Sequence, residues 1–236
     1  MELFPAIDLK DGQVVRLTQG DYNRVEVYSD DPVAVARDFR RRGAKNLHVV
    51  DLDGARDGRA VNHEVIAAIA QVPGLLLQVG GGIRDGARVA GYLELGVDRV
   101  ILGTAAVQDS GFLAAMLERY PGRIAVGVDA RDGRVAVGGW LETTALDALG
   151  FCKTLEEMGV PAIIYTDIAR DGAMAGTNRD IYRTLLESLG CDIIASGGIS
   201  SLEDVEALAG MGVHGAILGK ALYTGALTLE EVLARC

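Results

Sequence analysis

The sequence predicts a single (β/α)₈ barrel built from two similar halves, and three observations predict it. Short apolar, β-branched runs alternate with amphipathic segments of helical period, which is the pattern of a parallel sheet covered by helices. Eight such units occupy 236 residues, slightly fewer than the roughly 250 of a typical barrel. Motifs of the first half also recur in the second. A doubly wound open sheet is the competing fold, but a two-fold repeat of four βα units suits a closed barrel better.

The repeat is recognised from motifs that keep a constant spacing. Three pairs of residues in matching motifs are each 116 positions apart: Gly81 and Gly197, Gly103 and Gly219, and Asp51 and Asp167. An apolar run that ends at Asp8 also recurs, ending at Asp129, and a basic residue and an Asp-Gly pair follow it both times. We therefore expect half-barrels at about residues 1–121 and 122–236.

The expected strands are the apolar, β-branched runs, and the expected helices are the amphipathic segments of helical period. A glycine marks most helix ends. The expected strands are Leu3–Leu9, Asn46–Leu52, Leu75–Val79, Arg99–Leu102, Ile124–Asp129, Ala162–Asp167, Asp192–Ser196 and Gly215–Leu218. The expected helices are Pro32–Arg42, Asn62–Gln71, Gly86–Leu95, Gly111–Arg119, Ala145–Met158, Arg179–Leu189, Leu202–Met211 and Leu229–Ala234. Long loops are expected after Asp8 and after Asp129, on the side of a barrel where active sites lie.

Composition narrows the possible partners. The net charge of −10 argues against nucleic acid, and any phosphate ligand has to be held by local groups. No apolar run approaches the roughly 20 residues of a membrane span, and no signal segment precedes the first strand. The cysteines Cys152, Cys191 and Cys236 lack metal-ligand spacing and fit a reducing, cytoplasmic compartment.

Asp8 and Asp129 are the candidate catalytic residues. Because side chains alternate along a strand, Asp8 shares a face with Phe4 and Ala6. If that face lines the barrel interior, both carboxylates lie at the catalytic rim, on the first and fifth strands. Two carboxylates placed in this way suit a general base and a general acid that act on one substrate.

Glycine-rich strand ends predict two phosphate sites, one in each half. Glycine lets backbone N–H groups approach a phosphate, and a following helix adds partial positive charge. The candidate residues are Gly81, Gly82, Gly103 and Thr104 in the first half and Ser196, Gly197, Gly198, Gly219 and Lys220 in the second. The expected ligand therefore carries a phosphate at each end.

Further residues are assigned candidate roles from their positions in the sequence. Arg16, in the first long loop, is a candidate anion clamp, and Trp140, in the second, is a candidate for stacking on a planar heterocycle. Thr166 is placed to hydrogen-bond near the reacting centre, and Asp51 and Asp167 suit either supporting roles or direct catalysis. His48 is expected to face the helix layer, because its parity is opposite to that of Asp51. No metal-ligand cluster and no dinucleotide fingerprint is present, which implies a reaction without a cofactor.

The chain resembles the histidine-biosynthesis isomerase that acts on phosphoribosyl-formimino-aminoimidazole-carboxamide ribotide. The matching segments are Phe4–Gly12, Val15–Leu17, Gln19–Asp21, His48–Gly54, Gln78–Arg84, Thr166–Ile168, Asp171-Gly172 and Ala195–Ile199. The resemblance implies a half-barrel duplication, a bisphosphorylated ribotide substrate, no cofactor and an Amadori rearrangement of an aminoaldose to an aminoketose.

The resemblance also implies residue roles. Asp8 is expected to take a proton from the ribose carbon beside the aminal centre, and Asp129 to open the furanose ring. Thr166 is expected beside the reacting sugar, and Arg16, Trp140 and Asp171 are expected to shape the closed site, with Gly20 part of the matching first loop. We expect the enzyme to act as a monomer.

Three alternatives stay open at this point. A bifunctional relative also isomerises phosphoribosyl anthranilate, but its fifth loop carries an arginine beside the Trp, whereas here Gly138 and Gly139 precede Trp140. The cyclase subunit of imidazole-glycerol-phosphate synthase shares the barrel and the paired aspartates but resembles this chain less. A non-catalytic phosphometabolite-binding barrel gives no reason to keep carboxylates near an anionic ligand.

Overall fold

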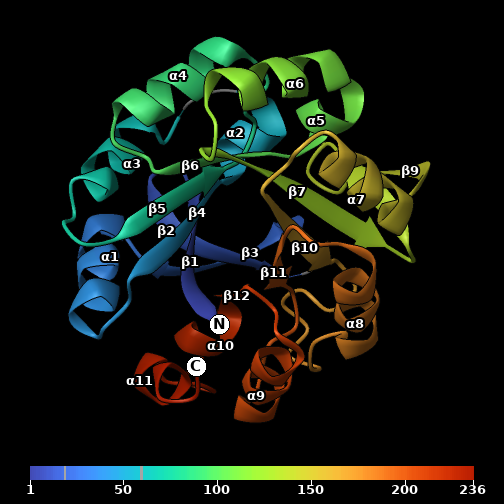
Figure 1. The fold of residues 1–236 in the computed structure, drawn as a ribbon. Coiled ribbons are helices and arrows are strands. Elements are labelled where there is room, and N and C mark those ends of the chain that lie inside the picture. The colour runs from blue at the N-terminus through green and yellow to red at the C-terminus, as the bar shows by residue number, and fades with distance from the viewer. Residues whose placement is uncertain (19, 59–60) are drawn as a thin grey trace.

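A closed parallel barrel forms the centre of the computed structural model, which describes residues 1–18, 20–58 and 61–236 (Figure 1). Within these ranges the barrel strands are β1 (Glu2–Lys10), β4 (Asn46–Asp51), β5 (Leu76–Gly80), β6 (Arg99–Leu102), β7 (Ile124–Arg131), β10 (Ala162–Asp167), β11 (Asp192–Ser196) and β12 (Gly215–Leu218). Parallel pairing of β1 with β12 and of β10 with β7 closes the ring. The predicted (β/α)₈ barrel is therefore confirmed.

Helices cover the outside of the barrel (Figure 1). The covering helices are α1 (Pro32–Arg41), α3 (His63–Ala70), α4 (Gly86–Glu94), α6 (Ser110–Arg119), α7 (Ala148–Glu157), α8 (Arg179–Ser188), α9 (Leu202–Met211) and α11 (Leu229–Leu233). Several begin at a side-chain cap: Asp31, for example, accepts from Ala34 N and precedes Pro32 at the first helical position.

The core has two layers, as strand alternation requires. The larger cluster lies between the strands and the helices and includes Ile7, Leu47 and Val49. A smaller cluster fills the barrel interior with Phe4, Ala6, Ile101, Ala125, Ala162, Ile164, Ile194 and Ile217. Since Phe4 and Ala6 belong to the interior cluster, the face that Asp8 shares with them points into the barrel, as expected.

The two expected long loops contain hairpins that the sequence patterns did not reveal. After Asp8 the chain forms β2 (Gln13–Thr18) and β3 (Asp21–Ser29), and after Asp129 it forms β8 (Arg134–Val137) and β9 (Glu142–Asp147). β9 also corrects the expected helix at Ala145–Met158. This helix begins only at Ala148, because Asp147 accepts from Gly150 N and caps it.

Short helices after three strand ends were also not predicted: α2 (Leu52–Asp57), α5 (Thr104–Gln108) and α10 (Lys220–Tyr223). α5 and α10 occupy equivalent places in the two halves, with Gly103 and Gly219 as their capping residues. None of the helices in the described ranges has the length and apolar character to cross a membrane.

Candidate active site

A pocket opens at the carboxyl ends of the barrel strands, and all the residues that the sequence predicts for the site, apart from Asp51 and Asp167, line it. These residues are Asp8, Arg16, Gly20, Gly81, Gly82, Gly103, Thr104, Asp129, Trp140, Thr166, Asp171, Ser196, Gly197, Gly198, Gly219 and Lys220. Gln19, part of the matching first-loop motif, lies outside the described residues. Motifs that are far apart in the sequence thus meet at one pocket of the fold.

Asp8 lies in β1 and forms an ion pair with Arg16, which β2 supplies from the adjacent hairpin strand. Arg16 Nη1 donates to Asp8 Oδ2 over 2.7 Å, and the side chains are 10% and 17% exposed, respectively. Burial raises the pKa of Asp8 to about 6, although Arg16 lowers it; Asp171 adds to the increase. At neutral pH Asp8 is mostly ionised, with a basicity suited to a general base.

Asp129 ends the matching run in β7, on the other side of the pocket. Burial raises its pKa, polar contacts with Trp140 and Thr166 lower it, and the nearby Asp171 raises it. Among the described residues, no cation forms with Asp129 an ion pair such as the one that Arg16 makes with Asp8. Its surroundings therefore favour the protonated acid more than those of Asp8 do.

The glycine-rich strand ends have the same backbone conformation in both halves. Gly103 has φ −109° and ψ −106°, and its counterpart Gly219 has φ −106° and ψ −108°. Space is open beside Gly103, whereas the guanidinium of Arg16 lies directly against Gly219. Lys220 Nζ donates to the carbonyl oxygen of Gly172 over 3.3 Å. The second of these ends therefore has a guanidinium against its backbone and an ammonium group bound to the carbonyl of Gly172, whereas the first is open.

The hairpins of the two halves meet over the pocket. Gly20, in the β2–β3 turn, lies so close to the ring of Trp140 that no Cβ fits between them. Trp140 itself follows two glycines with positive φ and has φ +71°. Gly138 N donates to the Thr104 hydroxyl over 2.9 Å, which ties the β8–β9 turn to the first glycine site. Trp140 thus contacts the opposite loop and faces the acid Asp129.

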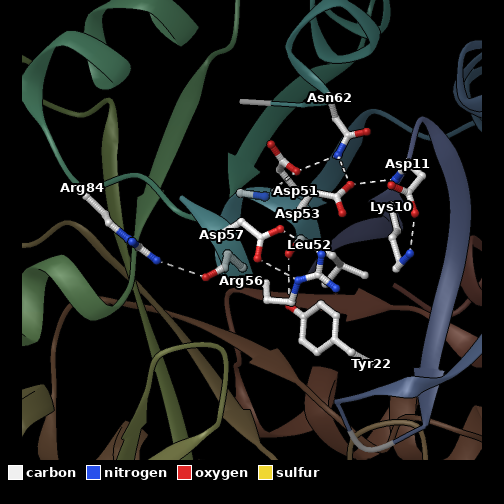
Figure 2. A network of polar contacts seen from close by, with 12 residues as sticks. Lys10, Asp11, Tyr22, Asp51, Leu52, Asp53, Arg56, Asp57, Asn62 and Arg84 are labelled. Atoms are coloured by element: carbon white, nitrogen blue, oxygen red, sulfur yellow. Dashed lines mark hydrogen bonds and ion pairs between the residues drawn. The ribbon is translucent and has the colours of Figure 1, made fainter. Parts of the chain in front are cut away.

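Asp51 and Asp167, the second repeated pair, anchor loops and do not line the pocket. Asn62 donates to Asp51 Oδ1 over 2.7 Å, and Asn178 donates to Asp167 Oδ2 over 2.7 Å. Figure 2 shows Asn62 between Asp51 and Asp53. Of the two roles that the sequence left open, this geometry favours support of the loops.

The same network holds the turn after β1. Asp11 N donates to Asp53 Oδ2 over 2.7 Å (Figure 2). Gly12 N donates to Asn62 Oδ1 over 2.9 Å. Asp53 and Asn62 are both buried. The hairpin that carries Arg16 is therefore fixed at its turn to the start of the second βα unit, which keeps Arg16 close to Asp8.

The expectation for His48 is wrong, because its side chain lines the pocket and does not face the helix layer. Its neighbours Leu47 and Val49 pack against the helices, so His48 has interior parity. His48 and Asp51 do lie on opposite faces of β4, as expected, but Asp51 points away from the pocket and caps α2. The expectation took the face of Asp51 as the interior one, whereas the interior face is that of His48.

Sequence reasoning also missed some residues of the pocket. Tyr22, Arg84 and Met174 line the pocket. Arg84 follows the repeated Gly-Gly-Ile segment, and its guanidinium donates to the carbonyl oxygen of Ala55 over 3.2 Å (Figure 2). A cation directly after a predicted phosphate loop was the signal available for Arg84. Tyr22 and Met174 gave none.

Comparisons with known proteins identify the family of the chain. A model of the histidine biosynthesis protein family matches residues 2–228. A relative from a Picosynechococcus species, named 1-(5-phosphoribosyl)-5-((5-phosphoribosylamino)methylideneamino)imidazole-4-carboxamide isomerase, is 52% identical over 236 residues, covering 99% of this chain and 92% of its own. Relatives of the same name from Listeria monocytogenes and Chloroflexus aggregans are 48% and 50% identical, each covering 99% of this chain and 97% of their own. The chain therefore belongs to the histidine biosynthesis protein family, in the group of these imidazole-4-carboxamide isomerases.

Proposed function

We propose that the protein catalyses the Amadori rearrangement of the bisphosphorylated aminoaldose of histidine biosynthesis to the corresponding aminoketose. The observation that carries the proposal is the pair Asp8 and Asp129, which face one pocket from β1 and β7 in unequal electrostatic surroundings. The names of the relatives support the same reaction.

The proposed reaction uses the two carboxyl groups in turn. Asp129 protonates the ring oxygen while the bond between that oxygen and C1 breaks, which leaves a protonated imine. Asp8 then removes the proton from C2, so that a C1–C2 double bond forms and the imine nitrogen becomes neutral. The enolamine loses its hydroxyl proton and gains one at C1, which gives the ketone.

The two glycine-rich strand ends are the proposed phosphate sites. They lie on opposite sides of the pocket, and their backbones match, so a substrate with a phosphate at each end can span the acids between them. Backbone N–H groups hold anions without a large positive net charge, which fits a chain of charge −10.

We also propose that the enzyme acts in the cytoplasm and as a monomer. Cys152, Cys191 and Cys236 are free thiols, which favours a reducing compartment. Both acids and both proposed phosphate sites come from one chain, so catalysis needs no residue from a second copy.

The test is an assay of the wild-type protein with the aminoaldose and, in parallel, with phosphoribosyl anthranilate. We expect conversion of the aminoaldose, and a loss of roughly 10²–10⁴-fold or more in kcat for Asp8→Asn and for Asp129→Asn. Circular dichroism and thermal unfolding check that both variants remain folded. Near-wild-type activity in either variant contradicts its role, and turnover of the anthranilate shows a second substrate.

A further inference from the structure

Three polar side chains lie next to one another in a single layer of the barrel interior. His48, Gln78 and Arg99 are neighbours in register on β4, β5 and β6. Gln78 Nε2 lies 2.9 Å from His48 Nδ1, and Gln78 Oε1 accepts from Arg99 Nε over 3.0 Å and from Arg99 Nη2 over 2.6 Å. Arg99 is the first residue of β6, and His48, at the other end of this row of hydrogen bonds, lines the pocket.

The direction of these hydrogen bonds fixes a proton on the histidine. Arg99 can only donate, so the oxygen of the Gln78 amide must face Arg99 and its NH₂ group must face His48. The NH₂ group donates, and His48 Nδ1 therefore accepts and carries no proton. A neutral ring then has its proton on Nε2. The hydrogen bonds of the described residues leave Nε2 without a protein partner.

The surroundings keep the ring neutral. Burial lowers the pKa of His48 to about 3, and the positive charges of Arg16 and Arg99 act in the same direction. On the neighbouring strand β1, Ala6 is the register partner of His48, and Asp8 lies two residues further along, one layer nearer the pocket mouth. The carboxylate of Asp8 is paired with Arg16. His48 is thus a neutral N–H donor at the pH of the cytoplasm.

The second half of the barrel shows that the fold does not need this row of hydrogen-bonded side chains. At the 116-residue offset His48, Gln78 and Arg99 correspond to Ile164, Ile194 and Gly215, which are also neighbours in register. Ile164 and Ile194 belong to the apolar interior cluster. Burying polar groups costs free energy that an apolar pair avoids. The polar version occurs only in the half that carries Asp8.

We propose that the Nε2–H of His48 donates a hydrogen bond to the hydroxyl oxygen on C2 of the reacting sugar, and that Gln78 and Arg99 are positioning residues that hold His48 in this tautomer. The proposal rests on the proposed isomerase function. The C2 oxygen gains negative charge as the enolamine becomes the ketone, so a fixed donor stabilises that step. C2 is also the carbon from which Asp8 takes its proton, and His48 lies beside β1 in the layer below Asp8.

The tautomer can be measured without any turnover. The protein has only three histidines, so the ring ¹⁵N signals of His48 are assigned by their loss in His48→Leu. We expect the neutral Nε2–H pattern in wild-type protein between pH 5.5 and about 8. Arg99→Met frees the Gln78 amide to rotate and should give a mixture of tautomers, whereas Arg99→Lys keeps a donor and should retain Nε2–H. A doubly protonated ring, or a neutral ring with its proton on Nδ1, in the wild-type protein would contradict the proposed tautomer.

Kinetics test the contact with substrate. We expect His48→Leu to lower kcat roughly 10- to 100-fold with little change in KM, because the donor acts on charge that develops during the reaction. The fold should tolerate leucine, since the second half holds isoleucine at this place. Arg99→Met should lower kcat and Arg99→Lys should restore it, a rescue that a purely structural role does not predict.

The outcomes separate the two proposals. Absence of aminoaldose turnover by the wild-type protein contradicts the proposed function, whatever the tautomer. An active wild type together with unchanged kcat in His48→Leu contradicts the substrate contact alone. Folding of each variant is checked by its thermal unfolding midpoint.

Discussion

At the scale of single residues, two aspartates from one repeated motif have different surroundings. Asp8 is paired with Arg16, whereas Asp129 contacts the Trp140 indole and the Thr166 hydroxyl. A nearby cation stabilises the ionised form of a carboxyl group, so a carboxyl group without a cationic partner keeps its proton more readily. Two carboxylates at equivalent places of the two halves thus have surroundings that suit the proposed base, Asp8, and the proposed acid, Asp129.

The pKa of Asp8 sets a prediction for the pH dependence of activity. A general base works when ionised, so kcat/KM should fall as the pH decreases through about 6. Arg16 lowers this pKa, and Arg16→Met should therefore move the acid limb to higher pH, while Arg16→Lys keeps a positive charge and should move it less. The pH profile of kcat/KM reports the pKa in the free enzyme. An acid limb in Arg16→Met at or below the wild-type position would contradict this assignment.

Trp140 offers a second prediction at this scale, because it is the only tryptophan of the chain. A Cβ at Gly20 would overlap its ring, so Gly20→Ala should displace the indole toward solvent and shift its fluorescence to longer wavelength. Gly12→Ala is the matched control, since Gly12 also has positive φ but open space around it. Equal spectra for the two variants would show that the loops do not meet in solution.

At the scale of elements, the barrel strands were predictable and the hairpins were not. Barrel strands are buried on both faces and give continuous apolar runs. No residue of β3 or β9 is buried, so hydrophobic periodicity cannot reveal these strands. A signal was present in the turns: Asp11-Gly12 and Asp132-Gly133 all have positive φ, and Asp-Gly flanked by strands is a strong hairpin signal.

The glycine loops give a prediction about stability. Gly81 has φ +109°, and a Cβ there would overlap the backbone of Asp51. Gly81→Ala should therefore lower the free energy of unfolding by roughly 2–4 kcal/mol through strain and displacement of the loop. Gly91, inside α4 with open space around it, is the control, and Gly91→Ala should raise stability by roughly 0.5–1 kcal/mol. Denaturant unfolding measures both. A Gly81→Ala variant as stable as wild type would mean that the loop relaxes freely.

At the scale of the whole molecule, the repeat predicted the architecture but not the contacts between halves. The recurrence of motifs in the two halves placed the acids and both glycine sites at one rim, because equivalent strand ends of a barrel share a face. No local pattern links Gly20 to Trp140, or Arg16 to Gly219, since these pairs are far apart in sequence. The prediction for His48 was wrong for a related reason. Its orientation was inferred from Asp51, and only the fold shows that Asp51 points away from the pocket and caps α2.

The closed ring also predicts where the chain can be cut. Cys236 lies close enough to the amino terminus for its pKa to respond to that charge, and β1 pairs with β12. Pro121 and Gly122 are exposed in the turn that precedes β7, at the end of the barrel away from the pocket. A permutant that joins residues 236 and 1 through a short flexible linker and opens between 121 and 122 should fold and keep kcat/KM within about tenfold of wild type. Opening between Gly138 and Gly139 should preserve the barrel but release Trp140 and cost more activity, because that turn covers the pocket. Thermal unfolding and the isomerase assay compare the two, and the reverse order of activities would contradict the assignment of the two barrel ends.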